Sequence, residues 1–318
     1  MIEFLPYLKD KSFLLKISTL ILIIAVSLVL SMVLGIIIAI PIFGSGILQQ
    51  LNDLNDFNNP FTIKVIKYFQ VVNQVGIFIL PVLFFAYLEN RNIGAYLKID
   101  RRPGFIPVLL SILMVIASIP AINWMVEVNR QMSLPDFLQG IESWMKETEE
   151  RTNALSEAFL NINTVSALII NLVIIAFLAS VGEEFLFRGV VLRLFNDWLK
   201  NSHLAIIISA VLFSALHLQF YGFLPRMILG ILFGYVFIWT GTLWIPVILH
   251  FIFNGLTVVA AYLFNRGLIS TDIESFGTTD DKFQIIGSCM VTVIFLLLIY
   301  LRKNKTVIYK NKKEETYI

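Results

Sequence analysis

Long runs of apolar residues, separated by short polar segments, occur along almost the whole chain. A helix needs about 20 apolar residues to cross the ~30 Å hydrocarbon core of a bilayer, because each residue adds about 1.5 Å. The run that begins at Met227 is too long for one span, and we divide it at Thr240-Gly241-Thr242. The pattern thus predicts an all-α, polytopic membrane helix bundle with about eight transmembrane helices, at residues 17–43, 71–88, 104–126, 158–182, 204–223, 227–239, 243–264 and 283–301.

The composition supports a membrane protein and excludes several other classes. Of the 318 residues, 58% are hydrophobic and 14% are charged, and the mean hydropathy is +0.82. Soluble domains are about 45–50% apolar and about 25% charged, so a water-soluble or disordered chain is excluded. A single cysteine, Cys289, excludes an intramolecular disulfide and any cysteine-built metal site. The net charge of +2 gives no reason to expect a nucleic-acid partner.

The distribution of lysine and arginine predicts the orientation in the membrane. With eight spans both termini lie on one side, and 16 of the 24 Lys and Arg residues then fall on that side. The positive-inside rule places this side in the cytoplasm. We therefore predict a multi-pass protein of the cell membrane with both termini cytoplasmic and a basic tail that binds anionic lipid.

The longest segment outside the predicted spans covers residues 127–157, on the outer side. Glu142/Lys146 and Glu147/Arg151 have the i,i+4 order that stabilises a helix, and apolar residues recur among them at helical spacing. This pattern favours a helix that lies on the membrane or caps the bundle. A substrate-binding lid is the alternative interpretation.

A few ionisable or strongly polar residues interrupt the apolar spans in the second half of the chain. A charged side chain at the centre of a bilayer costs at least about 2.5 kcal/mol, so each such residue is a candidate for function. They fall into three short motifs: Glu183-Glu184 with Arg188, Phe213 with His217, and His250 with Asn254.

Helical geometry predicts how these residues are paired. Glu184 and Arg188 are four residues apart, the favourable order for an ion pair within one helix. The two members of each later motif likewise share a helix face. Glu183 is rotated by about 100° from Glu184, so the two carboxylates are expected to serve different partners. Glu183 is then predicted to face the bundle interior, near the cytoplasmic end of its span.

The residue types in these motifs suit the hydrolysis of an amide bond. A carboxylate in a poorly hydrated interior can act as a general base toward water, and imidazole and amide groups can stabilise an oxyanion. The simpler alternative is that these groups only link helices through hydrogen bonds. Five polar groups in three hydrophobic helices favour a site.

The three motifs, in this order, resemble the CPBP family of CAAX proteases and bacteriocin-processing enzymes, also called the Abi family. The resemblance covers roughly residues 160–265 and implies an intramembrane glutamic endopeptidase with a cavity open toward the cytoplasm. By this resemblance Glu183, assisted by His217, would activate water, and His250 and Asn254 would form the oxyanion hole. Glu184 and Arg188 would support them, and Phe213 would shape the cavity. Expected substrates are membrane-associated proteins or peptides, with or without a lipid group.

The resemblance also predicts a division of the chain and leaves alternatives. Residues 1–155 would be a variable membrane region, residues 156–268 the catalytic core with four spans, and residues 269–318 the last span and the basic tail. We expect no cofactor, but Glu183, His217 and His250 would also suit a hydrolytic zinc site, which is one alternative. The others are a non-catalytic immunity or scaffold protein of the same fold, and a transporter that uses buried Glu and His as a proton relay.

Overall fold

The computed structural model describes residues 7–47, 54, 56–270, 279 and 281–315, and the side chains only as far as Lys303. The chain is 81% helical and the described residues form no strand, which confirms the all-α prediction. Seven helices in the described part are long and apolar enough to cross a membrane. The predicted polytopic membrane bundle is therefore confirmed.

Seven elements of the bundle begin and end as single helices. They are α1 (Phe13–Phe43), α6 (Phe105–Arg130), α7 (Gln139–Leu160), α11 (Ser202–Ala215), α12 (Phe223–Thr240), α13 (Trp244–Asn265) and α14 (Lys282–Glu315), and two short helices, α5 (Ile93–Leu97) and η2 (Asp136–Leu138), lie in connections.

Two further spans are interrupted by π-helical turns. The first is built from α3 (Pro60–Asn73), η1 (Gln74–Ile79) and α4 (Leu80–Glu89). The second consists of α8 (Val165–Asn171), η3 (Leu172–Leu178), α9 (Ala179–Glu184), η4 (Phe185–Val191) and α10 (Leu192–Leu199). Because π-helical turns are uncommon and are frequent at functional sites, their position on both sides of α9 draws attention to that short helix.

The fourth predicted span, residues 158–182, was placed too early in the chain. Residues 158–160 belong to α7, and the span runs without a break from Val165 to Leu199. Glu183 therefore lies near the middle of this helix and not at its end, contrary to the prediction. Two of the charges that suggested an end neutralise each other within the helix, since Arg188 pairs with Glu184 at 2.9 Å.

The fifth predicted span is only partly helical. The helix α11 has 14 residues and is about 21 Å long, too short to cross the hydrocarbon core by itself. The irregular segment 216–222, which we call the reentry segment, leads from α11 to the start of α12. It includes Leu218 with a φ of 54°, a left-handed conformation that is costly for a leucine. Irregular backbone within a membrane is tolerated where it is buried in protein or lines a polar cavity.

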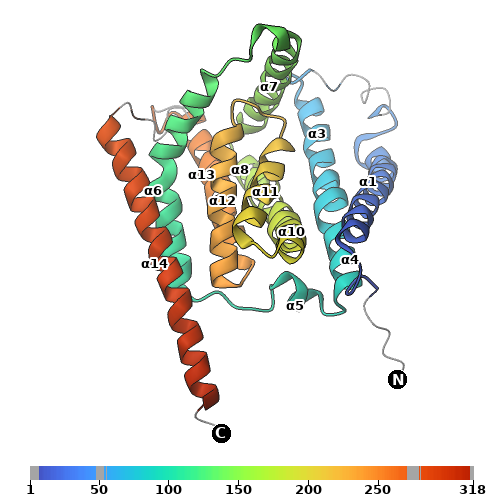
Figure 1. The fold of residues 1–318 in the computed structure, drawn as a ribbon. Coiled ribbons are helices and arrows are strands. Elements are labelled where there is room, and N and C mark those ends of the chain that lie inside the picture. Colours follow the sequence, from blue (N-terminus) through green and yellow to red (C-terminus); the bar gives the residue numbers. More distant parts are fainter. Residues whose placement is uncertain (1–6, 48–53, 55, 271–278, 280, 316–318) are drawn as a thin grey trace.

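One end of the bundle gathers the start of α1, the helix α5 and the turn between α12 and α13. Lys16 of α1 pairs with Glu89 of α4 at 2.9 Å, and the Trp244 indole donates to the carbonyl of Ile99 at 2.8 Å. Figure 1 shows the end of α14 on this side and α7 at the opposite end. Both ends of the described chain thus lie at one end of the bundle; its assignment to the cytoplasm stays a prediction.

The segment between the third and fourth predicted spans forms the helix α7, which covers part of the opposite end. Lys146 pairs with Glu142 at 2.8 Å, as its i,i+4 spacing predicts. Trp144 of α7 packs on Phe220 of the reentry segment, with 5.3 Å between the ring centroids. The carboxylate of Glu149 accepts a hydrogen bond from the backbone N–H of Tyr221. The helix α7 is therefore attached directly to the reentry segment.

The N-terminal half of the chain packs closely against the helix that carries the motifs. A Cβ atom at Gly182 would lie 2.8 Å from the Cβ of Phe78 and 2.9 Å from Oε1 of Gln74, both in η1. A Cβ atom at Gly189 would lie 2.9 Å from the side chain of Leu97. These close approaches need glycine, and they fix the position of α9 and η4 against η1 and α5.

Candidate active site

The centre of the site is a buried ion pair between two residues of the fourth span. Nη1 of Arg188 lies 2.9 Å from Oε1 of Glu184, and both side chains are almost fully buried. Nη2 of the same guanidinium donates to the carbonyl of Gly230 in α12 at 3.1 Å. The rings of Phe213 and Phe233 lie 4.8 and 5.6 Å from the guanidinium carbon, at cation–π distance. The structure thus brings together the three predicted residues Glu184, Arg188 and Phe213.

His250 of α13 connects the two adjacent carboxylates. Its Nδ1 lies 2.9 Å from Oε1 of Glu184, and its Nε2 lies 3.7 Å from Oε2 of Glu183. The prediction that the two carboxylates serve different partners was therefore wrong. His250 reaches both carboxylates despite the rotation of about 100° between them, because the two nitrogen atoms of an imidazole ring lie on different edges.

Glu183 and His217 form the more accessible side of the site. Nε2 of His217 lies 3.8 Å from Oε2 of Glu183, and 30% of the His217 side chain is exposed, compared with 11% for Glu183. Nδ1 of His217 lies 2.8 Å from the carbonyl oxygen of Phe213. A carbonyl can only accept, so Nδ1 carries a hydrogen, and when the ring is neutral Nε2 presents its lone pair toward Glu183.

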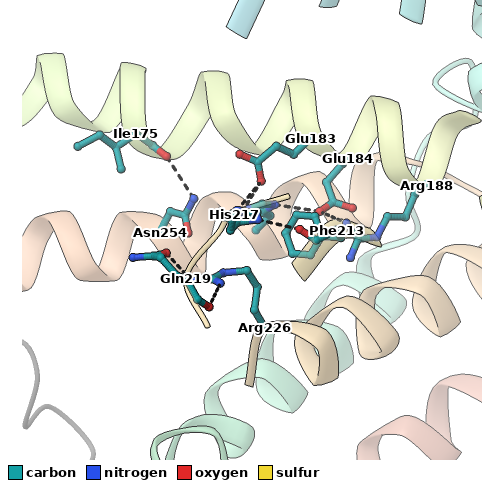
Figure 2. A network of polar contacts seen from close by, with 10 residues as sticks. Ile175, Glu183, Glu184, Arg188, Phe213, His217, Gln219, Arg226 and Asn254 are labelled. Carbon is teal, nitrogen blue, oxygen red and sulfur yellow. Dashed lines mark hydrogen bonds and ion pairs between the residues drawn. The ribbon is translucent and has the colours of Figure 1, made fainter. Parts of the chain in front are cut away.

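The fourth polar residue, Asn254, lies one helical turn beyond His250 on α13. Its Nδ2 donates to the carbonyl of Ile175 in η3 at 3.2 Å, which uses one of the two amide hydrogens. Figure 2 shows the Asn254 side chain between α13 and the helix that carries Glu183. The hydrogen bond to Ile175 fixes the orientation of the amide.

Comparison with known families matches residues 165–256 to the model described as type II CAAX prenyl endopeptidase Rce1-like. This segment, called the Rce1-like segment below, is similar to that family. The resemblance predicted from the three motifs is thereby confirmed, and the family implies a CAAX-type intramembrane endopeptidase activity. No curated protein and no solved structure matches the chain.

All seven predicted site residues lie within the Rce1-like segment, which spans α8 to the middle of α13. Two further polar residues of the same segment, Gln219 and Arg226, lie beside them and were missed in the sequence (Figure 2). Nη2 of Arg226 donates to Oε1 of Gln219 at 2.6 Å. A cation within an apolar run would have indicated a functional residue, but Arg226 was missed because it lies between two predicted spans, 204–223 and 227–239.

A cavity of about 240 Å³ lies between α6, α7 and the residues around the start of α12, and its lining includes none of the seven predicted site residues. Tyr221, Phe223 and Leu224 line it from one side and Met145 from the other. Its walls are mostly apolar, and Phe220 and Tyr221 of the reentry segment contribute to them. An apolar cavity at this position can hold the side chains of a hydrophobic peptide.

The same site was weighed as a zinc centre on the basis of its ligand types. Among the residues described, no group of three or more His, Cys, Asp or Glu side chains is arranged to hold a metal ion. Oε2 of Glu183 lies 3.7 and 3.8 Å from the two Nε2 atoms. Zinc dependence stays a separate hypothesis, which the effect of a chelator on cleavage would test.

Proposed function

We propose that the protein is an intramembrane endopeptidase in which Glu183 activates water for attack on a peptide bond. One observation carries this proposal. Oε2 of Glu183 is buried between the Nε2 atoms of His217 and His250, at 3.8 and 3.7 Å, and has no hydrogen-bond partner in the described part of the chain. Oε2 of Glu184 also lacks a hydrogen-bond partner there, but Glu184 is already engaged through Oε1 by Arg188 and His250, whereas Glu183 has only the two imidazoles beside it. A buried carboxylate oxygen left without a hydrogen bond is costly to maintain, and a reaction that uses it provides a reason for it.

The proposed reaction starts with a water molecule between Glu183 and His217. The lone pair on Nε2 of His217 accepts one of its hydrogens and orients it, and Glu183 takes the other proton as the hydroxide attacks the peptide carbonyl. The protonated Glu183 then donates to the leaving amine as the C–N bond breaks. The products are a carboxylic acid and an amine, and Glu183 is again ionised.

The proposed oxyanion hole consists of His250 and Asn254. Nδ1 of His250 is held by Glu184, and a proton on Nε2 would point at the negative oxygen that forms during attack. The amide hydrogen of Asn254 that is not used by Ile175 would be the second donor to the same oxygen.

The proposed substrates are membrane-associated proteins or peptides. The family match implies such substrates in general, and the position of Glu183 near the middle of a membrane-spanning helix is consistent with it. The backbone groups of an extended peptide are costly to keep without hydrogen-bond partners in an apolar environment, so segments near the membrane surface, where water is available, are favoured as substrates.

The direct test compares the wild-type protein with Glu183→Gln. The purified proteins in detergent are incubated with a library of membrane-anchored peptides, and the products are identified by mass spectrometry. We expect a loss of cleavage of about 10²- to 10⁴-fold in Glu183→Gln, the range for removal of a general base. Arg102→Gln, an exposed residue at the opposite end of the bundle, is the matched control and should cleave normally.

The same assay separates the mechanisms. Cleavage that persists in Glu183→Gln would contradict the role of Glu183. Loss of cleavage on chelation, restored by added zinc, would replace the metal-free mechanism by the zinc alternative.

A further inference from the structure

Arg226 lies on the face of α12 that looks toward the site. Gly230, four residues later on the same face, accepts a hydrogen bond from Arg188 at 3.1 Å. Phe233, seven residues after Arg226, packs on the ring of His250 with a centroid distance of 6.0 Å. Residues spaced by four and seven share one side of a helix, so Arg226 faces the site one turn nearer the α7 end than Gly230 does.

The contacts of Arg226 leave its charge unbalanced. Nη2 donates to Oε1 of Gln219 at 2.6 Å, and Nη1 makes a long contact of 3.5 Å with the carbonyl of the same residue. Both acceptors are neutral. In the described part of the chain, no carboxylate lies within 4.0 Å of this guanidinium. Glu149 and Glu183 interact with it only at longer range.

A partly buried arginine without a carboxylate partner calls for an anion. The buried cations Arg188 and Lys16 have carboxylate partners at 2.9 Å, whereas Arg226, like Lys67, is held by neutral acceptors. Arg226 differs from Lys67 in lying on the helix face that looks toward the site. A guanidinium presents parallel N–H donors that match the two oxygens of a planar carboxylate. In addition, Arg226 lies in the first turn of α12, where the helix dipole favours negative charge.

We propose that Arg226 binds a carboxylate group of the peptide substrate. This inference rests on the proposed endopeptidase function and adds a substrate class to it: peptides that carry a carboxylate close to the bond that is cut. The carboxylate is either the free C-terminus or an Asp or Glu side chain. A phosphate is disfavoured, because a doubly charged group would lie between Glu149 and Glu183, whose charges repel it.

The position of Arg226 explains how such contact would serve cleavage. One helical turn, about 5.4 Å, separates it from Gly230, which contacts the ion pair at the centre of the site. The side chain of Gln219, two residues after His217, accepts a hydrogen bond from Arg226. A substrate carboxylate at Arg226 would therefore hold the adjoining peptide segment next to the accessible side of Glu183 and His217.

Binding can be measured without cleavage in a Glu183→Gln background of the full chain. The probes are dansyl-labelled peptides of Ala, Leu and Phe in detergent micelles, each prepared as the C-terminal acid and the C-terminal amide. A second amide pair carries an internal Glu or an internal Gln. We expect one carboxylate form to bind about 10-fold or more tightly than its neutral counterpart, and the pair that shows the preference identifies the source of the carboxylate.

Variants of Arg226 then assign the preference to this side chain. In Arg226→Gln the charged and neutral peptides should bind equally. Arg226→Lys should keep part of the preference, because it keeps the positive charge but loses the parallel N–H donors of the guanidinium. Arg102→Gln is the matched control for loss of one exposed positive charge and should keep the full preference. Melting temperatures of all variants show whether they are folded.

The proposal is overturned if charged and neutral peptides bind equally, if neither binds, or if the preference survives in folded Arg226→Gln. The proposed function fails separately. If the otherwise wild-type chain and Glu183→Gln cleave equally well while the carboxylate preference depends on Arg226, the carboxylate site stands and the role of Glu183 does not.

Discussion

Glu184 and Glu183 are adjacent in the sequence, and they lie on two different sides of α9. On the closed side, Glu184 shares one oxygen between Arg188 and His250, at 2.9 Å each, and the aromatic rings around the guanidinium exclude water. On the open side, Glu183 lies beyond hydrogen-bond distance of both imidazoles and next to a half-exposed loop. Glu184 is thus held by Arg188 and His250 and stabilises the structure, while Glu183 is left available for chemistry.

The largest effect on stability is expected from neutralising the closed side. Glu184→Gln leaves the charge of Arg188 buried without a carboxylate, and breaking such a pair costs about 3–5 kcal/mol. Glu183→Gln removes a buried charge that has no hydrogen bond, so it should leave the free energy of unfolding unchanged or raise it. Unfolding of both variants in detergent measures the difference. Equal losses in the two variants would show that the two sides are not distinct.

A smaller effect is expected from adding volume to the closed side. Gly182→Ala places a methyl group 2.8 Å from the Cβ of Phe78, an atom too near the backbone to move freely. Overpacking of this kind costs about 1–3 kcal/mol. Gly255→Ala is the control, because its methyl group would meet its nearest neighbour at 3.7 Å and should be neutral or stabilising. A Gly182→Ala protein as stable as wild type would contradict the close packing of η1 on α9.

On the open side, a substitution that adds backbone freedom should cost little stability where the backbone is strained. Leu218 adopts a φ of 54°, which costs a non-glycine residue about 1 kcal/mol, so Leu218→Gly trades this strain against the entropy of glycine and should be nearly neutral. Leu216 is also exposed but has a φ of −69°. Leu216→Gly relieves no strain and should lose about 0.5–1 kcal/mol. Thermal unfolding distinguishes them, and a larger loss in Leu218→Gly would contradict this account of the reentry segment.

The smallest effect on stability is expected from Lys98, at the end of the bundle farthest from α7. Burial, together with the charges of Arg193 and Arg101, lowers the pKa of Lys98 to about 8 from 10.5. Between these values the unfolded chain holds a proton that the folded chain has released, so this group makes the protein more stable as the pH rises from about 8 to 10.5. Lys98→Met should therefore raise the melting temperature at pH 7, and the difference from wild type should shrink toward pH 10.

Lys200→Met is the control for that experiment. Lys200 ends α10 in the same left-handed conformation as Lys98 ends α5, but it is exposed. A difference between wild type and Lys98→Met that stays constant with pH would contradict the effect of burial on Lys98.

Much of this arrangement could be predicted from the sequence, because its strongest signals are local. Apolar length identifies the spans, and i,i+4 spacing identifies the pair Glu184–Arg188. Three motifs in order identified the Rce1-like segment. The continuation of the fourth span to Leu199 was not predicted, because a charge in a helix looks like an end until its partner is known.

Other features depend on contacts between segments far apart in the chain, which no local pattern contains. The bridge made by His250 requires the distance between α9 and α13. The amide of Asn254 is fixed by the carbonyl of Ile175, and any backbone carbonyl looks the same in the sequence. Arg226 became a candidate only when its neutral partner Gln219 and the absence of a carboxylate within ion-pair distance in the described residues were known.

The contact of Gly182 with η1 has a consequence for how far the protein can be divided. Gly182, the residue before the proposed catalytic carboxylate, packs directly against Phe78 and Gln74. The position of Glu183 in the bundle therefore depends on a segment that lies outside the residues matched to the family. Grafting the Rce1-like segment onto a different N-terminal half would preserve every motif and lose the surface that supports it. The smallest transplantable unit of this fold therefore includes the second span as well as the Rce1-like segment, in which three helical segments carry the motifs.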